Sequence, residues 1–376
     1  MKNWPLMFNI PIYQPFLGGN EKKYVLECLD SSWISSKGKF VSLFEEKFAR
    51  YIGSKYATSV SNGTVGLHLS LVALGIGPGD EVIVPTLTYI ASVNSITYTG
   101  ATPVFVDSLE STWQMDPQAI IQKITSRTKA IMVVHLYGHP CDMDSIMQIA
   151  KEKELFVIED CAENFGSYYN GKHVGLFGDV AVFSFFGNKT ITTGEGGMVV
   201  TQNAFIHDKA VRYKGQGLAK DREYWHDLIG YNYRMTNICA AIGLAQLEQA
   251  DEFIAKKRTL ASWYMHALDS SFLTFHHETG NVQHSYWMCS ILVDTPDLRD
   301  PLRQHLASLG IETRPLFYPV HTMNMYQQNQ TFPIAENIGS RGINLPSWPH
   351  LEKEQVGFIC DEIHSFLGQK CLTSRF

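Results

Sequence analysis

One lysine, Lys189, lies between aromatic residues and a glycine cluster in the stretch SFFGNKTITTGEGG, residues 184–197. A lone lysine is most often a solvated surface group. Here, partial desolvation by Phe185 and Phe186 would lower the pKa of the amine, as Schiff-base chemistry with a carbonyl compound requires. The glycines that follow would let a planar cofactor approach the backbone closely. The stretch therefore predicts a Schiff-base lysine.

If this lysine binds pyridoxal phosphate, the cofactor needs a carboxylate at its pyridine nitrogen, a wall for its ring, and backbone amides and hydroxyls for its phosphate. Each requirement has a candidate, although each candidate alone also has an ordinary structural interpretation as a cap or core residue. The residues are Asp160 in VIED for the nitrogen, Tyr89 in PTLTYIAS for the ring, and Gly63, Thr64 and Ser184 for the phosphate. The complete set, in this order, predicts a pyridoxal-phosphate site.

Other motifs are weaker. The segment GSYYNGKH, residues 166–173, matches the GxxxxGK part of a P-loop, but His173 stands where the magnesium-binding Ser or Thr belongs. His135 and His139 have i, i+4 spacing, yet HLYGHP lacks the HExxH glutamate and contains glycine and proline, so a strand end and a loop are expected. No GxSxG elbow is present, and we predict no metal site.

The elements around these residues follow a mixed pattern. Helical periodicity covers residues 21–29 and 39–51, and a turn opens a helix within 61–75. Short β-branched runs then alternate with helix-length stretches, which indicates a largely parallel sheet with helices on both faces and a ligand site beyond the strands' carboxyl ends. Residues 231–268 should be mostly helix. We expect a large α/β domain over residues 1–249 and a small α+β domain over 250–376.

Composition excludes several classes of protein. The chain has 376 residues and a net charge of −6, so it has no basic field for nucleic acid. Its seven cysteines are odd in number and never in CxxC spacing, which suits free thiols in a reducing compartment. Prolines interrupt the apolar N-terminus and no apolar stretch could span a bilayer. We expect a cytoplasmic protein without nucleic-acid or membrane partners.

Several segments together resemble the DegT/DnrJ/EryC1/StrS family of pyridoxal-phosphate sugar aminotransferases, over essentially the whole chain and most closely its perosamine branch. The resemblance implies the aspartate-aminotransferase fold (fold type I), with a mostly parallel seven-stranded sheet. The segments that carry it are SSWISSKGKF, SNGTVGLHL, VPTLTYIASVN, VHLYGHPCDM, VIEDCAE, FSFFGNKTITTGEGGM, YWHDLIGYNYRMTN, ETRPLFYPVHTM and RGINLPSWP.

The resemblance also implies roles for single residues. Lys189 would form the Schiff base, Asp160 would pair with the pyridine nitrogen, and Glu163 would lie near the ring hydroxyl, where many relatives have glutamine. Gly63, Thr64 and Ser184 would hold the phosphate. Asn232 would reach the phosphate in a neighbouring subunit, which implies a homodimer with shared active sites; assembly of dimers into tetramers stays open.

The implied reaction moves the amino group of L-glutamate to C4 of GDP-4-dehydro-6-deoxy-D-mannose through pyridoxamine phosphate, giving 2-oxoglutarate and GDP-perosamine, a precursor for cell-surface polysaccharide such as the O-antigen of lipopolysaccharide. The family's dehydratase branch has histidine in place of the lysine, so Lys189 argues against it. UDP- or dTDP-linked sugars with 3- or 4-keto groups stay open, as does a non-catalytic regulator that binds the cofactor; an aldolase or β-eliminating lyase fits the sugar-branch motifs less well.

Substrate contacts are less specific in the sequence. Arg314, Tyr318 and His321 in TRPLFYPVH are candidates for the nucleotide-sugar end, although structural packing explains this proline-rich segment equally well. The chain departs from the family pattern at Asn164, expected close to the cofactor, and at Asn324, expected near the nucleotide-sugar site. Both leave the substrate preference open.

Overall fold

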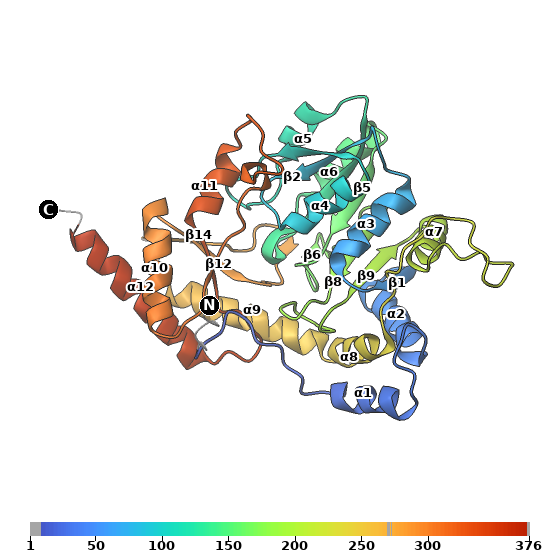
Figure 1. The fold of residues 1–376 in the computed structure, drawn as a ribbon. Helices are drawn as coiled ribbons and strands as arrows, with labels where there is room; N and C mark the ends of the chain where they lie inside the picture. The colour runs from blue at the N-terminus through green and yellow to red at the C-terminus, as the bar shows by residue number, and fades with distance from the viewer. Residues whose placement is uncertain (1–8, 269–270, 272, 374–376) are drawn as a thin grey trace.

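A seven-stranded sheet forms the centre of the computed structural model, which describes residues 9–268, 271 and 273–373 (Figure 1). The strand order is β1-β9-β8-β5-β4-β2-β3, and β9 is antiparallel to both neighbours while β8, β5, β4, β2 and β3 run parallel. This confirms the predicted mostly parallel sheet. Its strands are β1 Tyr56–Val60, β2 Glu81–Pro85, β3 Thr102–Val106, β4 Thr128–Val134, β5 Phe156–Asp160, β8 Val180–Ser184 and β9 Gly197–Thr201.

Helices cover both faces of this sheet because its strands bury apolar side chains in both directions. In β4, Ala130 and Met132 belong to one hydrophobic cluster, whereas Ile131 and Val133 belong to another on the opposite face. One face packs against α3 Gly63–Leu74, α4 Ile90–Tyr98 and α7 Ala204–Lys214, and the other against α2 Lys39–Ile52, α5 Pro117–Lys123, α6 Met143–Glu152 and α8 Asn237–Leu247.

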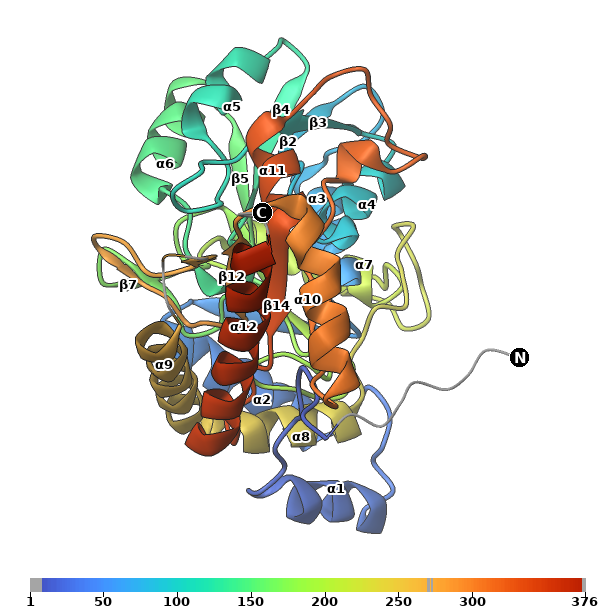
Figure 2. The ribbon, with the colours of Figure 1, turned by 90° about the vertical axis from the view of Figure 1, so that its left-hand side faces the viewer.

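A second, four-stranded antiparallel sheet has the order β10-β12-β14-β13 and lies with the C-terminal helices (Figures 1 and 2). Ile10, near the start of the described chain, packs into the same core and forms a bridge with Ile311. The domain division between residues 249 and 250 stays a prediction. The elements are β10 Leu273–Phe275, β12 Cys289–Val293, β13 Arg314–Pro315, β14 Gly342–Leu345, α9 Ala250–Ala267, α10 Pro296–Ser308, α11 Pro333–Arg341 and α12 Lys353–Thr373.

The expected helix over residues 231–268 is two helices preceded by extended chain. The Thr236 side chain accepts a hydrogen bond from Cys239 N and caps α8, so that helix begins at Asn237. Residues 231–236 instead lie along the end of α7, where Tyr231 N donates to Tyr213 O and Tyr233 N to Lys214 O. The segment is therefore mostly helix, as expected, and residues 231–236 are extended because their backbone pairs with the end of α7 and with Val60 and Ser61 at the end of β1.

The segment GSYYNGKH forms a β-hairpin, whereas a P-loop joins a strand to a helix. Its strands are β6 Tyr168–Tyr169 and β7 Lys172–His173, and β6 also pairs with β11 Val282–Gln283. Asn170 and Gly171 between them have φ of 50° and 73°, the left-handed conformation of a tight hairpin turn. The segment therefore does not form a P-loop, and its glycine serves the hairpin turn.

The remaining elements are α1 Glu21–Asp30 and two 3-10 turns, η1 Leu136–Gly138 and η2 Val320–Thr322. The segment 216–231, which we call the arm, extends from the body of the molecule between α7 and α8 (Figures 1 and 2). No described helix has the length and apolar character that a membrane crossing requires.

Candidate active site

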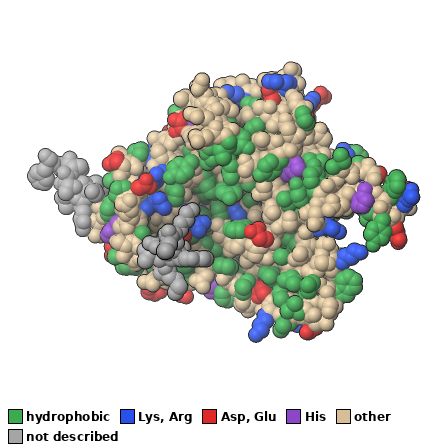
Figure 3. Space-filling model, in the orientation of Figure 1, with side chains coloured by type: hydrophobic (Ala, Val, Ile, Leu, Met, Phe, Trp, Pro, Cys, Tyr) green, Lys and Arg blue, Asp and Glu red, His purple; other side chains and the backbone are tan. Residues whose placement is uncertain are grey.

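A cavity of about 600 Å³ opens at the carboxyl ends of the parallel strands. Val134, Asp160 and Ser184, the last residues of β4, β5 and β8, line it, and so does Tyr89, which follows β2. Figure 3 shows the face of the molecule hollowed near its centre, with hydrophobic side chains around the hollow. The cavity therefore lies where the strand pattern predicts a ligand site.

Lys189 lies in the loop after β8, half-buried, and lines the cavity. Its Nζ lies 3.7 Å from the centre of the Trp287 ring, and its carbonyl accepts a 2.7 Å hydrogen bond from Tyr13 OH. Burial lowers the pKa of Lys189, against the opposing charges of Glu163 and Asp160. The amine is thus shifted toward the neutral form that acts as a nucleophile.

The aromatic neighbours of Lys189 differ from the prediction. Phe185 points away from the cavity into the core, where its ring packs 5.2 Å from Phe44 and 5.4 Å from Phe48. Phe186 does line the cavity, and Trp287 contributes the ring closest to the amine. Adjacent residues after a strand point to opposite sides, which is why only one phenylalanine can face the cavity.

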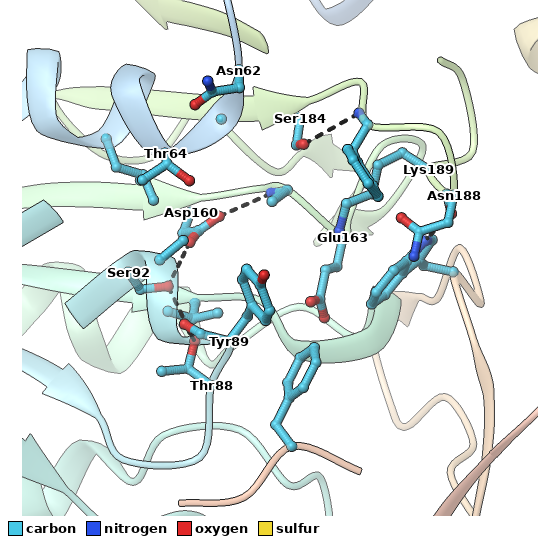
Figure 4. Close-up of a pocket in the computed structure, with 18 of the residues that line it drawn as sticks. Asn62, Thr64, Thr88, Tyr89, Ser92, Asp160, Glu163, Ser184, Asn188 and Lys189 are labelled. Carbon is cyan, nitrogen blue, oxygen red and sulfur yellow. Dashed lines mark hydrogen bonds between the residues drawn. The ribbon is translucent and has the colours of Figure 1, made fainter. Parts of the chain in front are cut away.

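Asp160 ends β5 and is 5% exposed. Its Oδ2 accepts a 2.7 Å hydrogen bond from Ser92 Oγ, and its Oδ1 accepts one of 3.0 Å from Ala162 N (Figure 4). Burial raises the pKa of Asp160, while these two bonds and the Lys189 charge oppose that rise. The carboxylate is held in a fixed orientation inside the cavity, as a partner for a protonated ring nitrogen would be.

Glu163 lies beside Asp160 and Lys189 in the cavity wall and is 5% exposed (Figure 4). Its Oε2 accepts a 2.7 Å hydrogen bond from Tyr137 N. Burial raises the pKa of Glu163 to about 7, although the Lys189 charge opposes the rise. Two buried acidic groups therefore line the cavity in unequal environments, and only Asp160 accepts hydrogen bonds through both of its oxygens.

The N-terminus of α3 forms a cradle that suits a phosphate. Asn62 caps the helix by accepting a 3.0 Å hydrogen bond from Val65 N, and the first-turn amides of Gly63 and Thr64 have no intrahelical acceptor. A Cβ on Gly63 would lie 3.0 Å from Ser184 Cβ, so only glycine leaves room between helix and strand. Helix dipole, free amides and the Ser184 hydroxyl converge here, as anion binding requires.

The other predicted residues divide into two groups. Tyr89, the N-cap of α4, and Arg314 line the cavity with Lys189 and Asp160. Tyr318 and His321 do not line the cavity: His321 is buried against Thr86 and Glu336, and Tyr318 lies near Arg299. The structure thus brings one of the three substrate candidates to the cavity.

Three more residues lie outside it. Asn232 is exposed beside the arm and does not line the cavity of its own chain. Asn164, expected close to the cofactor, is fully buried and is absent from the cavity wall, and Asn324 is exposed. These positions give no contact with a ligand in the same chain's cavity.

Sequence reasoning missed three residues that support the site. Ser92 bonds to Asp160, and its place three residues after Tyr89, on one helix face, was a usable signal. Tyr137 bonds to Glu163 through its backbone, and Trp287 lies under Lys189. Nothing local marks these two, because each reaches the site from a distant segment.

The histidine pair has no metal-site geometry. His135 directly follows β4 and His139 follows η1, which confirms the predicted strand end and loop. His135, Glu159 and Cys161 lie close enough to share an ion, but the Glu159 carboxylate already accepts hydrogen bonds from His135 and three backbone amides. Its bonding capacity is used within the protein.

Comparison with known proteins gives strong matches. The chain is 64% identical over 362 residues to the GDP-perosamine synthase of Escherichia coli O157:H7, covering 96% of this chain and 99% of that protein. It is 51% identical over 364 residues to the GDP-perosamine synthase of Vibrio cholerae, with 96% and 99% covered.

Solved structures agree in fold. The aminotransferase TlmJ from Streptoalloteichus hindustanus matches with a TM-score of 0.92 at 30% identity, covering 96% of this chain and 100% of that one. The PLP-form of Spr1654 from Streptococcus pneumoniae matches with a TM-score of 0.92 at 28% identity, covering 96% and 99%. Residues 15–364 match the family pattern itself, and the chain therefore belongs to the DegT/DnrJ/EryC1/StrS aminotransferase family.

Proposed function

We propose that this protein is a pyridoxal-phosphate-dependent aminotransferase that transfers the amino group of L-glutamate to C4 of GDP-4-dehydro-6-deoxy-D-mannose, yielding GDP-perosamine and 2-oxoglutarate. The observation that carries the substrate assignment is the 64% identity, over nearly the full length of both chains, to a protein named for this product. The cavity geometry supports pyridoxal phosphate as the cofactor, and so does the PLP-form of the structural relative Spr1654.

The residues around the cavity fit pyridoxal phosphate. Asp160 would hold the protonated pyridine nitrogen, and Gly63, Thr64 and Ser184 would hold the phosphate at the α3 N-terminus. Tyr89 would form a wall beside the ring. The open Gly63 cradle and the buried Asn188 Oδ1, which has no hydrogen-bond partner in the described residues, leave room and bonding capacity for a polar ligand. When bound, the cofactor supplies an electron sink for amino-group transfer.

The chain's own groups perform the proton chemistry. The amine of Lys189 acts as nucleophile and base, which its lowered pKa favours. With the cofactor bound, Asp160 would supply the negative charge that partners a protonated ring nitrogen, and the hydrogen bonds from Ser92 and Ala162 N stabilise that charge. Arg314, exposed at the cavity rim, is placed to meet the diphosphate of the nucleotide. A neutral sugar then takes its position from the bound nucleotide.

The test is an absorbance titration of the purified, cofactor-loaded protein. L-Glutamate should change the spectrum of the bound cofactor, and the GDP-linked ketosugar should restore it, whereas UDP- and dTDP-linked ketosugars should not. Lys189→Ala should abolish turnover, and Lys189→Arg should not rescue it because guanidinium stays protonated. A spectrum that glutamate leaves unchanged would refute the amino donor, and restoration by another nucleotide sugar would refute the substrate.

The active protein is a homodimer with shared sites in this proposal. In the arm, which directly precedes Asn232 in the sequence, the apolar side chains of Tyr224 and Ile229 are 92% and 91% exposed. Apolar side chains exposed to this degree indicate a surface that a partner covers. A second copy would bury them and bring Asn232 to the phosphate in its cavity.

Subunit mixing tests the shared site. Lys189→Ala and Asn232→Ala should each be impaired alone, and their mixture should regain activity, because a hybrid dimer contains one site with both native residues. Mixing Lys189→Ala with Asp160→Ala should give no recovery if both residues act in the same chain's site. Absence of recovery in the first mixture, with dimers present by sedimentation, would contradict the role of Asn232.

A cytoplasmic location and a place in cell-surface polysaccharide synthesis complete the proposal. The six cysteines in the described part of the chain are all unpaired, which supports a reducing compartment. Cell fractionation with an antibody against the protein would test the location.

A further inference from the structure

A second lysine, Lys257, is fully buried in the middle of α9. No carboxylate of the described residues pairs with its amine, which donates instead to two backbone carbonyls, that of Trp287 at 3.0 Å and that of Ser347. Burial lowers the pKa of Lys257 to about 8. An apolar side chain would avoid the free-energy cost of burying an amine without a counter-ion, so the two hydrogen bonds are what distinguishes a lysine here.

The first of these carbonyls belongs to Trp287, whose ring contacts the amine of Lys189. The Nζ of Lys189 lies 3.7 Å from the centre of that ring, and the indole N–H donates a 2.8 Å hydrogen bond to the carbonyl of Asn188. Asn188 and Lys189 both line the cavity (Figure 4). Because Lys257 bonds to the Trp287 backbone, it fixes the base from which the ring reaches Lys189.

Tyr13 makes a second connection between the two lysines. Its hydroxyl donates a 2.7 Å hydrogen bond to the Lys189 carbonyl, and Nζ of Lys257 lies 5.2 Å from the centre of its ring. A cation at this distance from an aromatic face is attracted to it. Tyr13 comes from the segment before α1 and Trp287 from the segment before β12. Lys257 therefore contacts two distant segments that converge on the loop of Lys189.

The bond from Lys257 to Ser347 has a different consequence. Ser347 follows β14, and its hydroxyl accepts a 2.7 Å hydrogen bond from the backbone N–H of Cys289, the first residue of β12. Lys257 thus also joins α9 to the second sheet, which would stabilise the fold without any effect on the site. The two roles differ in one respect: only the contacts through Trp287 and Tyr13 make the placement of Lys189 depend on Lys257.

We propose that Lys257 is a positioning residue for Lys189, and that through Trp287 and Tyr13 it holds the amine and the backbone of Lys189 at the cavity wall. Lys257 does not itself line the cavity. Its amine keeps two N–H bonds when it loses a proton, so both carbonyls stay bonded in either charge state. The consequence for turnover rests on the proposed aminotransferase function, whereas the placement of Lys189 is a property of the chain.

The first test observes the Trp287 ring in the full-length chain freed of cofactor. The chain has seven tryptophans, and fluorine NMR of protein labelled with 5-fluorotryptophan identifies the Trp287 signal by its absence in Trp287→Phe. Lys189→Met should move this signal, because the amine rests on the ring. In a chain that also carries Lys257→Met, the same change should move the signal less, because the ring is no longer held under the amine.

Lys256→Met is the matched control for this measurement. Lys256 is the neighbouring residue on α9, and its amine pairs with Glu252. In a chain that carries Lys256→Met, the displacement caused by Lys189→Met should equal that in the unaltered chain. An equal displacement with and without Lys257, or no displacement in the unaltered chain, would overturn the proposal.

The second test compares the binding of two cofactor forms. Pyridoxal phosphate has an aldehyde that reacts with a lysine amine, whereas pyridoxamine phosphate has none, and both carry the phosphate that the α3 N-terminus would hold. In equilibrium dialysis, Lys257→Met should weaken the binding of pyridoxal phosphate at least about tenfold and change that of pyridoxamine phosphate by less than about twofold. A purely structural role of Lys257 would affect both forms alike.

The outcomes separate this proposal from the proposed function. Equal weakening of the two forms, or binding of pyridoxal phosphate that Lys257→Met leaves unchanged, would overturn the proposal and leave the aminotransferase assignment to its own spectral test. An unaltered chain that binds neither form would refute the cofactor, and the fluorine measurement would then decide the role of Lys257. Should Lys257→Met fail to fold, Lys257→Gln, whose side chain is one bond shorter, replaces it in both tests with the same outcomes.

Discussion

Ser92→Ala would show how far the chemistry depends on the hydroxyl that orients Asp160 in the cavity wall. The substitution removes the hydroxyl that donates to Asp160 Oδ2 at 2.7 Å. Ser92 is 1% exposed, so water does not readily take the place of the hydroxyl. The bond from Ala162 N to Oδ1 remains. The variant therefore leaves the carboxylate in place with one hydrogen bond fewer.

The size of the effect follows from that bond. A hydrogen bond to a charged group contributes roughly 1.5 to 3 kcal/mol, and one pKa unit corresponds to about 1.4 kcal/mol. Loss of the bond should raise the pKa of Asp160 by about 1 to 2 units, in addition to the rise that burial causes. The role proposed for Asp160 requires an ionised carboxylate beside a protonated ring nitrogen, so activity should be present above the pKa of Asp160 and lost as the pH falls through it.

The assay is kcat/KM for L-glutamate as a function of pH. We expect the acid limb of Ser92→Ala to lie about 1 to 2 pH units higher, with a roughly 10- to 100-fold loss at a pH on that limb. Ser95→Ala is the matched control, since Ser95 is on the same helix, fully buried, and donates only to the carbonyl of Ser92. A loss of kcat/KM that is equal at every pH, or the same pH profile of kcat/KM for Ser92→Ala and Ser95→Ala, would refute the reasoning.

Three further predictions follow from buried groups. Gly63→Ala should weaken the binding of pyridoxal phosphate at least about tenfold in equilibrium dialysis, because the new Cβ would meet Ser184. The control is Gly187→Ala, whose Cβ would meet nothing within 4 Å and which should leave the binding unchanged. Burial lowers the pKa of His139 to about 4, so the unfolded chain binds a proton that the folded chain does not, and stability should fall by about 2 kcal/mol between pH 7 and 5. Urea unfolding at the two pH values measures this change. A His139→Asn variant whose free energy of unfolding falls by the same amount between pH 7 and 5 would contradict the prediction. Burial also lowers the pKa of Lys257 to about 8, so the unfolded chain binds more protons above that pH, and stability relative to Lys257→Met should rise by about 2 kcal/mol from pH 7 to 9.5. A difference that stays constant with pH would refute it.

Much of the fold was predictable because its signals are local. The β-branched runs became strands of the central sheet, and Asn62 before Gly63 marked the capped start of α3. The strand β1 was missed because its central Thr58 and Ser59 are polar; both are buried, and the Glu45 side chain accepts hydrogen bonds from them. Residues 231–268 are mostly helix as predicted, and only residues 231–236 are extended, because their backbone pairs with the end of α7 and with the end of β1.

By itself, the sequence determined the chemical type of the site. Lys189 and Asp160 follow strands whose parallel order sends their ends to one edge, so their meeting in one cavity followed from local pattern and topology. Tertiary structure alone decided what surrounds them. Trp287 reaches Lys189 from a distant segment next to β12, and Tyr137 reaches Glu163 through its backbone in a left-handed turn. Residue types and spacing encode which groups are present, whereas contacts between distant segments, and the burial that shifts their pKa values, arise only when the chain is folded.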